Sequence, residues 1–305
     1  MAEDKNVKTV KATKPVKTAK PIRTTKTAKS VAEKKVVKTT RPVRARKSVK
    51  ETKPAEAPKS FRVNYDIDAY SPPQIAARLD AVAAVKAKDS AVSTFLLGIN
   101  AGVFIALGAQ FATLVISDSG LHAGLTAVVG AICFCLGLIL VVVAGAELFT
   151  GNCMIFIGYL EKRITTRRIF DHWTISLIGN FVGCLLVVVF MYQAQQYTFF
   201  DYMVGAKALL IANGKVNLTF PAAFSKAVLC NAMVCMAVWV CFSARNVADK
   251  IMTLIFPIAG FVASGFEHLV ANMYFIPMGI FLKSKPEVVA AAEKMAGKTL
   301  DLSNL

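Results

Sequence analysis

The sequence predicts an all-α membrane protein whose transmembrane part is an inverted repeat. Two observations indicate this fold class. Long uncharged runs fill most of the chain between residues 90 and 282, and a Gly-x-Glu motif with an asparagine five residues after the glutamate occurs twice inside this region. About 20 apolar residues span a bilayer as a helix, whereas a glutamate at that depth is costly and needs a specific reason.

The first 60 residues are expected to form a disordered, lysine-rich tail. They contain 19 Lys and Arg against 5 Asp and Glu, so they carry +14 of the net charge of +17. With almost no large side chains, the segment has little to bury on folding. A solvated tail that also orients the protein is the simpler interpretation. The alternative is adhesion to anionic lipid, at about 1 kcal/mol per lysine near the surface; nucleic acid is a less favoured partner.

Residues 61–89 form a juxtamembrane segment with a predicted amphipathic helix. Ile75, Leu79, Val82 and Val85 recur at helical spacing. Such a stripe suits a helix that lies along the membrane interface, and it equally suits a helix that packs against the rest of the protein.

The transmembrane channel domain is predicted to cover residues 90–282, with a C-terminal segment at 283–305. Uncharged runs predict the first four spans, and the fourth has near-minimal length. The run 148–160 is too short alone and continues the second span, while the last two runs together make the fifth. The runs are 90–117, 119–146, 148–160, 172–200, 227–244, 251–266 and 269–282.

Loop charge predicts the orientation. The loops 161–168 and 243–250 fall on the side of the tail and contain six basic residues, whereas 117–120 falls opposite and contains none. Cytoplasmic loops carry an excess of Lys and Arg. We therefore expect a multi-pass protein of the inner (cytoplasmic) membrane with a cytoplasmic N-terminus.

The repeated motif predicts that the two halves have opposite topology. Three spans separate the copies, an odd number, and such halves form a substrate site where broken helices meet near the midplane. The glutamates and asparagines of the motif are best explained as structural residues that accept or donate hydrogen bonds around each break. The matching positions, 120 residues apart, are Gly145 and Gly265, Glu147 and Glu267, and Asn152 and Asn272.

Three stretches give the chain a resemblance to the formate/nitrite transporter family of pentameric anion channels, over roughly residues 70–282. They are "GAELFTGN" with "GNFVG" behind it, "AVLCNAMVCMAVW", and "FVASGFEHLVANMYFIPMGI". The resemblance implies an aquaporin-like fold with broken second and fifth spans and one pore through each protomer. It also implies a homo-pentamer that carries formate, nitrite, hydrosulfide or similar small monovalent anions, without a cofactor.

The resemblance also implies a set of pore residues. His268 would lie at the pore centre with Asn231 facing it, and Lys215 would lie in a loop at the outer vestibule. The remaining positions would form the loop at the break in the second helix (Leu148, Phe149 and Thr150) and the apolar slits on either side of the histidine (Phe134, Leu138 and Phe261). Apart from the resemblance, Lys215 is equally explained as a solvated loop residue, and the slit positions as lipid-facing residues.

The expected mechanism depends on protonation. A bare anion crosses a dry apolar slit at a cost of many kcal/mol, whereas a neutral weak acid crosses at far less. The vestibule lysine and the helix ends would attract the anion, and a proton from His268, or from water by way of it, would neutralise it. In the competing mechanism the anion stays charged and protonated His268 is its counter-ion. An aquaporin-like channel for neutral small solutes is the alternative function.

Enzymatic activity and metal binding are not expected. The chain shows no paired carboxylates, no nucleophile motif and no metal-ligand spacing, and its seven cysteines lie scattered through the spans. An intramembrane enzyme that uses Glu267 and His268 is therefore less favoured than a channel.

One feature departs from the family pattern. In the family a sixth span follows the fifth directly, but the residues after 282 are too few and too polar to cross a membrane. Five spans are therefore expected in this chain. A truncation, a frameshift or an incomplete gene would explain the difference, and a five-span protomer would leave one pore wall open to lipid.

Overall fold

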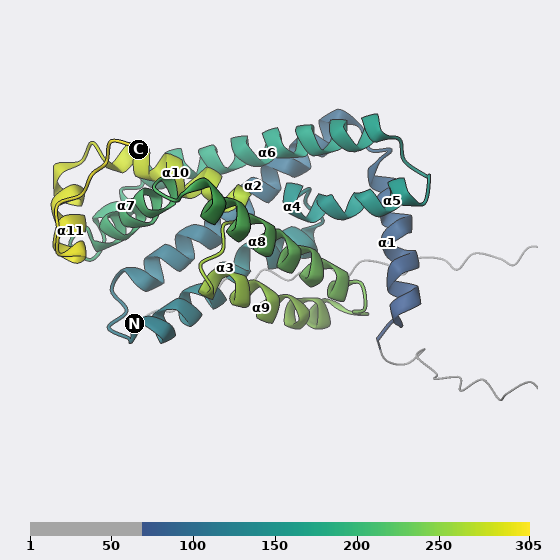
Figure 1. The fold of residues 1–305 in the computed structure, drawn as a ribbon, viewed down its shortest axis with the longest axis horizontal. Coiled ribbons are helices and arrows are strands. Elements are labelled where there is room, and N and C mark those ends of the chain that lie inside the picture. Colours follow the sequence, from purple (N-terminus) through teal and green to yellow (C-terminus); the bar gives the residue numbers. More distant parts are fainter. Residues whose placement is uncertain (1–68) are drawn as a thin grey trace, which may run out of the picture. The chain divides into compact units, whose positions relative to one another are not determined.

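The computed structural model describes residues 69–305, and all of the regular structure in this range is helical (Figure 1). This confirms the all-α class. The predictions for the tail, and for the first residues of the 61–89 segment, lie outside the described residues.

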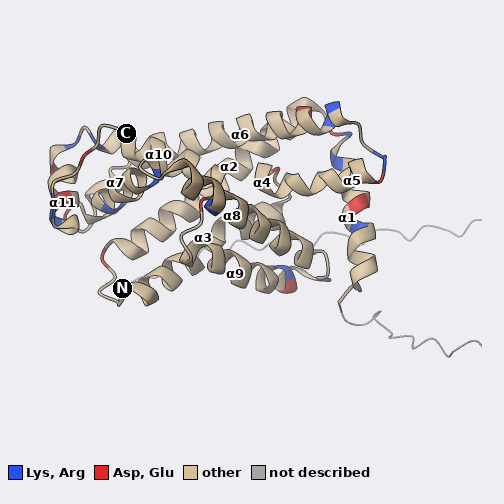
Figure 2. Cartoon of the chain, viewed as in Figure 1, with Lys and Arg blue, Asp and Glu red and all other residues tan. Residues whose placement is uncertain are grey.

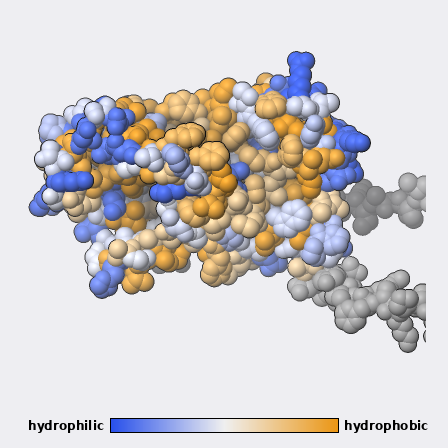
Figure 3. All heavy atoms as spheres, in the orientation of Figure 1, coloured by the Kyte–Doolittle hydropathy of each residue, from blue (hydrophilic) through white to orange (hydrophobic). Residues whose placement is uncertain are grey.

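Four described helices are long and apolar enough to cross a membrane: α2 (Ala91–Ser117), α3 (Ala123–Ala144), α6 (Thr166–Gln193) and α8 (Phe220–Cys241). Charged residues gather at the two ends of the helices, around α1 and α5 at one end and α7 and α11 at the other (Figure 2). The space-filling view shows a mostly hydrophobic surface between these ends (Figure 3). Such a band is what the hydrocarbon core of a bilayer requires.

The predicted second and fifth spans each consist of separate helices. After α3 the chain continues as α4 (Phe149–Asn152), η1 (Cys153–Ile155) and α5 (Phe156–Leu160); the later pair is α9 (Val247–Ala263) and α10 (Leu269–Leu282). Glycines with left-handed backbone follow α3 and α9, Gly145 with φ of 72° and Gly265 with φ of 67°. Only glycine adopts this conformation without a steric cost, so both copies of the motif need it at the helix end.

Helices α2 and α6 approach closely through small residues. A Cβ added to Gly102 would lie 2.1 Å from the carbonyl oxygen of Asn180, and one added to Gly183 would lie 2.1 Å from that of Ile99. Gly98 and Gly179 face each other in the same contact. The two Gly-x-x-x-Gly patterns of the sequence therefore serve close backbone packing, as such patterns do in membrane helices.

Helix α1 (Pro72–Lys86) is a packing helix. Ile75 and Leu79 are buried, and the helix contacts η1 and α5, whereas Val85 is 65% exposed. An ion pair of 2.9 Å between Asp80 and Arg163 also joins α1 to the loop that follows α5. Of the two sequence interpretations, the structure supports packing against the protein.

The long connection after α6 contains regular structure. It begins with η2 (Gln196–Thr198) and continues with α7 (Met203–Val216), which packs on α10 and on α11 (Pro286–Ala296). Lys215 lies in the last turn of α7, so the prediction that it lies in a loop is wrong. The buried side of α7 consists largely of small and aliphatic residues such as Ala208, Leu209 and Ala212, which give the helix a packing face despite its lysines.

Candidate functional site: a buried histidine and two ion-pair clusters

His268 precedes α10 as its N-cap residue, and both of its ring nitrogens have partners. Nδ1 accepts a hydrogen bond from the backbone N–H of Ala271 (3.0 Å), and Nε2 lies 3.2 Å from Oγ1 of Thr150. The residue is 4% exposed. Because Nδ1 is an acceptor, the neutral ring carries its proton on Nε2. The histidine therefore presents a donor toward Thr150.

Two phenylalanines lie against the imidazole. The ring of Phe261, on α9, stacks on His268 with centroids 5.8 Å apart and planes at 15°, and Phe134, on α3, meets the imidazole edge-on at 6.3 Å. Both phenylalanines are buried. The structure thus brings two of the three predicted slit residues together around the histidine.

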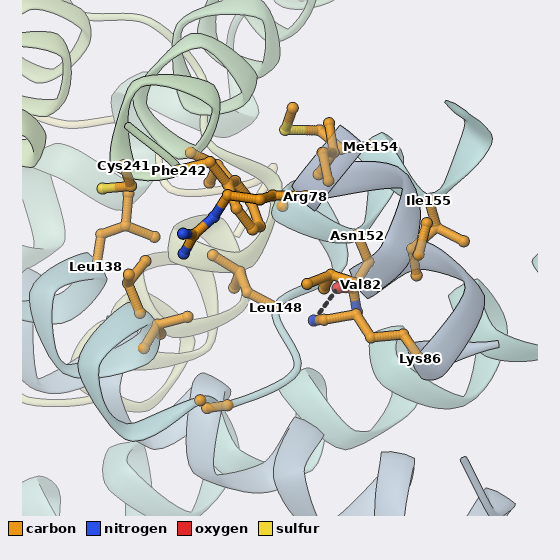
Figure 4. A pocket seen from close by; sticks show the side chains of 18 of the residues that line it. Arg78, Val82, Lys86, Leu138, Leu148, Asn152, Met154, Ile155, Cys241 and Phe242 are labelled. Carbon is orange, nitrogen blue, oxygen red and sulfur yellow. Dashed lines mark hydrogen bonds between the residues drawn. The ribbon is translucent and has the colours of Figure 1, made fainter. Parts of the chain in front are cut away.

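Two cavities open at opposite ends of the helices. The one near α7 has a volume of about 700 Å³ and is lined by Lys215, Phe134, Phe261 and His268 among others. The one near α1 has a volume of about 230 Å³, and its lining includes Leu138 and Leu148 (Figure 4). Leu138, the third predicted slit residue, therefore borders the second cavity.

Asn231 lines a third cavity, of about 400 Å³, together with Thr150 and His268. Its Oδ1 atom is buried and has no hydrogen-bond partner among the described residues. Unpaired buried acceptors cost free energy. Asn231 therefore borders the cavity that also reaches the histidine, and its buried amide oxygen is unpaired.

Lys215, Glu267 and Asn272 form a polar cluster at the α7 end. The ammonium of Lys215 and the amide of Asn272 each donate to Oε2 of Glu267, at 2.8 Å in both cases. The side chains of the lysine and the glutamate are 14% and 11% exposed. A carboxylate this deep is stabilised by its two donors.

Lys86, Glu147 and Asn152 form a matching cluster at the α1 end. Lys86 donates to Oε2 of Glu147 (2.9 Å) and to Oδ1 of Asn152 (3.0 Å), and the asparagine amide donates to the same carboxylate oxygen (2.8 Å). Figure 4 shows the lysine reaching Asn152 from α1. In both copies of the motif a lysine and an asparagine thus donate to the glutamate, although the lysines come from different helices. Only Asn152 also accepts from its lysine, because Oδ1 of Asn272 has no partner among the described residues.

Asn180 on α6 fixes the loop between α3 and α4. Its amide donates to the carbonyl oxygens of Gly98 and Glu147, both at 2.9 Å, and its Oδ1 accepts from the backbone N–H of Phe149 at 2.9 Å. These bonds satisfy backbone groups at the interruption, which lipid could not do. Thr150 follows Phe149 directly, so Asn180 also helps to position the hydroxyl that meets His268.

The sequence interpretation missed three residues of these clusters: Lys86, Asn180 and His172. Asn180 could have been recognised, because it lies in the "GNFVG" stretch that contributes to the family resemblance. Lys86 and His172 had no such signal, since each reaches Glu147 from a distant part of the chain. No group of His, Cys, Asp and Glu within residues 69–305 has the arrangement of a metal site.

Comparisons with known proteins agree on one family. The sequence model of a family described as formate/nitrite transporter matches residues 73–300. Formate channel FocA of Escherichia coli K12 is 40% identical over 217 residues, which cover 71% of this chain and 76% of that protein. FocA of Haemophilus influenzae is 39% identical and covers 70% of this chain and 75% of its own length.

Two solved structures are similar in fold. A pentameric formate channel with formate bound has a TM-score of 0.62 at 36% identity, covering 70% of this chain and 86% of its own. An FNT family ion channel has a TM-score of 0.61 at 22% identity, covering 73% and 96%. At that identity the second likeness concerns the fold alone.

Proposed function

The chain belongs to the formate/nitrite transporter family, and we propose that it is a channel for small monovalent weak-acid anions such as formate, nitrite or hydrosulfide. The relatives named above are formate channels, and a relative of known structure holds formate. The observation that carries the proposal is the buried imidazole of His268, which lies against two phenylalanines and is hydrogen-bonded to Thr150.

The proposed pathway joins the α7-end cavity to the α1-end cavity past His268. Phe134 and Phe261, which line the α7-end cavity, would form the apolar constriction on one side of the histidine. Leu138 and Leu148, which line the α1-end cavity, would form it on the other. A charged anion loses its hydration in such a constriction, and that cost falls steeply once the acid is neutral. Protonation of the substrate near His268 would therefore decide whether it crosses.

Two lysines support an anionic rather than a neutral substrate. Lys215 and Lys86 line the two opposite cavities, each beside a glutamate of the repeated motif. Their ammonium groups would attract an anion to either end. Loss of hydration in the apolar constriction would then raise the basicity of the substrate. A channel for neutral small solutes, the alternative function for this fold, does not need a lysine in the cavity at each end.

The cap bond of His268 favours protonation-assisted passage over the counter-ion mechanism. An imidazolium donates from both nitrogens, so a stably charged His268 would lose the hydrogen bond from Ala271 at the start of α10. The neutral ring keeps this bond while Nε2 donates toward the pore. In our proposal the ring takes up a second proton from hydronium only transiently. The substrate anion accepts the Nε2 proton and leaves as a neutral acid, and the ring returns to its neutral form.

The assembly and membrane placement are part of the same proposal. We infer a homo-pentamer, by likeness to the pentameric formate channel, in the inner (cytoplasmic) membrane with the N-terminus on the cytoplasmic side. The substrate anion and protons are the transported partners. The lysine-rich tail would add contact with anionic lipid.

Flux measurements test the proposal. Purified protein in liposomes would be given formate, nitrite, hydrosulfide or glycerol on one side at pH 5, 6, 7 and 8, and uptake would be followed by stopped flow. We expect uptake of the weak acids that rises as the pH falls and no uptake of glycerol. Glycerol uptake without formate uptake would overturn the proposal in favour of the neutral-solute channel.

A further inference from the structure

His172 is a buried histidine that the proposed pathway does not use. It lies near the start of α6, its side chain is 5% exposed, and neither ring nitrogen has a hydrogen-bond partner among the described residues. Buried polar atoms are normally paired, so two unpaired nitrogens on one ring need an explanation.

The ring faces the carboxylate of Glu147. Nε2 of His172 is 3.6 Å from Oε2 of Glu147, too far for a hydrogen bond and near enough for a small rotation to make one. That oxygen already accepts from Lys86 and Asn152. The charged groups that act on the histidine are Glu147 from the α3–α4 segment, Lys86 from α1 and Asp89 from the turn before α2.

We propose that His172 is a positioning residue that sets the strength of the Lys86–Glu147 ion pair. When the ring is neutral, Glu147 holds the ammonium of Lys86. When the ring takes up a proton it becomes a cation that donates from both nitrogens, so Nε2 binds Glu147 and partly neutralises it. Lys86 is then released into the α1-end cavity, which it lines.

The sign of the effect follows from the charges. With a neutral ring, Lys86 and Glu147 cancel; with a protonated ring, the three groups together carry +1. The lysine side chain is 28% exposed, so this extra charge acts on the cavity where an anion would enter. Burial disfavours a charged imidazole, so protonation of the ring needs acid below the range of a free histidine. The α1 end would therefore hold anions more strongly in acid.

This inference rests on the proposed function for its transport consequence, and a second measurement keeps the two separable. The first experiment determines the half-saturating formate concentration in liposomes at pH 5, 6, 7 and 8. His172→Asn is compared with the unchanged protein and with His122→Asn, which alters an exposed histidine at the start of α3. The protonation of formate itself is the same in all three samples, so it does not contribute to the difference between them.

Between pH 8 and pH 5 we expect the half-saturating concentration to fall about three- to tenfold more in the unchanged protein than in His172→Asn. His122→Asn should behave like the unchanged protein. Equal pH dependence in all three would overturn the proposal. If His172→Asn does not assemble, His172→Gln takes its place, because it too keeps a polar side chain that does not titrate.

The second experiment needs no transport. Lysine labelling by an amine-reactive ester is quantified by mass spectrometry, with Lys215 as the internal reference. At pH 5 the ratio of Lys86 to Lys215 labelling should be at least twofold higher in the unchanged protein than in His172→Asn, and at pH 8 the two ratios should agree. Equal ratios at both pH values would overturn the proposal even if formate transport is confirmed.

Discussion

Oγ1 of Thr150 lies 3.2 Å from Nε2 of His268, so side chains 118 positions apart, one from each copy of the repeated motif, meet in one hydrogen bond. The hydroxyl belongs to the first turn of α4 and the imidazole to the cap of α10. Each half of the repeat therefore contributes one side chain to the polar centre of the proposed pathway.

Replacement of Thr150 tests this contact. Thr150→Val keeps the shape and removes the oxygen, and since a hydrogen bond contributes about 0.5–1.5 kcal/mol, formate flux should fall roughly two- to tenfold. Thr150→Ser retains the oxygen and should stay near the original flux. Stopped-flow uptake on both variants measures the effect, and equal loss in the two would mean that the hydroxyl has no role.

His268→Asn separates the two mechanisms. If the ring relays a proton, net weak-acid uptake should fall by about two orders of magnitude, while an electrogenic anion current appears because the polar centre survives without a proton donor. The counter-ion mechanism predicts that the current also falls. Planar-bilayer current and acid uptake, measured on the same preparation, distinguish these results; uptake unchanged from pH 5 to 8 would remove His268 from the mechanism.

Loss of Lys215 should cost stability as well as anion capture. Lys215→Met leaves Glu267 largely buried without its cation, which should lower the free energy of unfolding by about 2–3 kcal/mol, less than a fully buried pair would lose. The double variant Lys215→Met with Glu267→Gln removes both charges. It should therefore recover most of the lost stability, whereas its half-saturating formate concentration should stay as high as in the single variant. Thermal melting in detergent and half-saturating formate concentrations check the two parts; a double variant no more stable than the single one would contradict the pairing.

Close packing of α2 and α6 predicts which glycines tolerate a methyl group. Gly102→Ala would place a Cβ 2.1 Å from backbone oxygen, so the helices must separate and assembled protein should be lost. Gly124→Ala meets nothing within 4 Å and should be neutral or slightly stabilising, by up to about 1 kcal/mol. Gel filtration of both variants gives the comparison, and normal assembly of Gly102→Ala would disprove the packing argument.

Removal of residues 1–60 should leave formate flux per protomer unchanged, because none of the proposed pore residues lies there. Binding to vesicles that contain anionic lipid should weaken in the same variant if the tail acts as we propose. Flux and vesicle co-sedimentation of the shortened and full chains measure the two effects, and a large loss of flux would give the tail a role in transport.

Residue patterns could predict the spans, the motif and its glycines, because membrane length and glycine's left-handed backbone act locally. The family resemblance pointed to His268 and Lys215. The contact between Glu147 and Lys86 could not be predicted, since it joins residues 61 positions apart through the tertiary fold. Helix α7 was not predicted from the sequence, because its lysines interrupt the apolar pattern of the face that packs on the protein. The arrangement of Phe134 and Phe261 around the imidazole likewise depends on how α3 and α9 cross, which composition does not encode.

The bond from Ala271 to Nδ1 of His268 gives the ring's protonation a backbone reporter. This amide is the only hydrogen-bond partner of Nδ1 among the described residues, so its exchange with deuterated solvent should be slow while the ring accepts from it and fast whenever that nitrogen is protonated. The start of α10 would then fray each time the imidazole becomes fully charged. The exchange rate of the Ala271 amide would thus report how often the imidazole becomes protonated, without any substrate present.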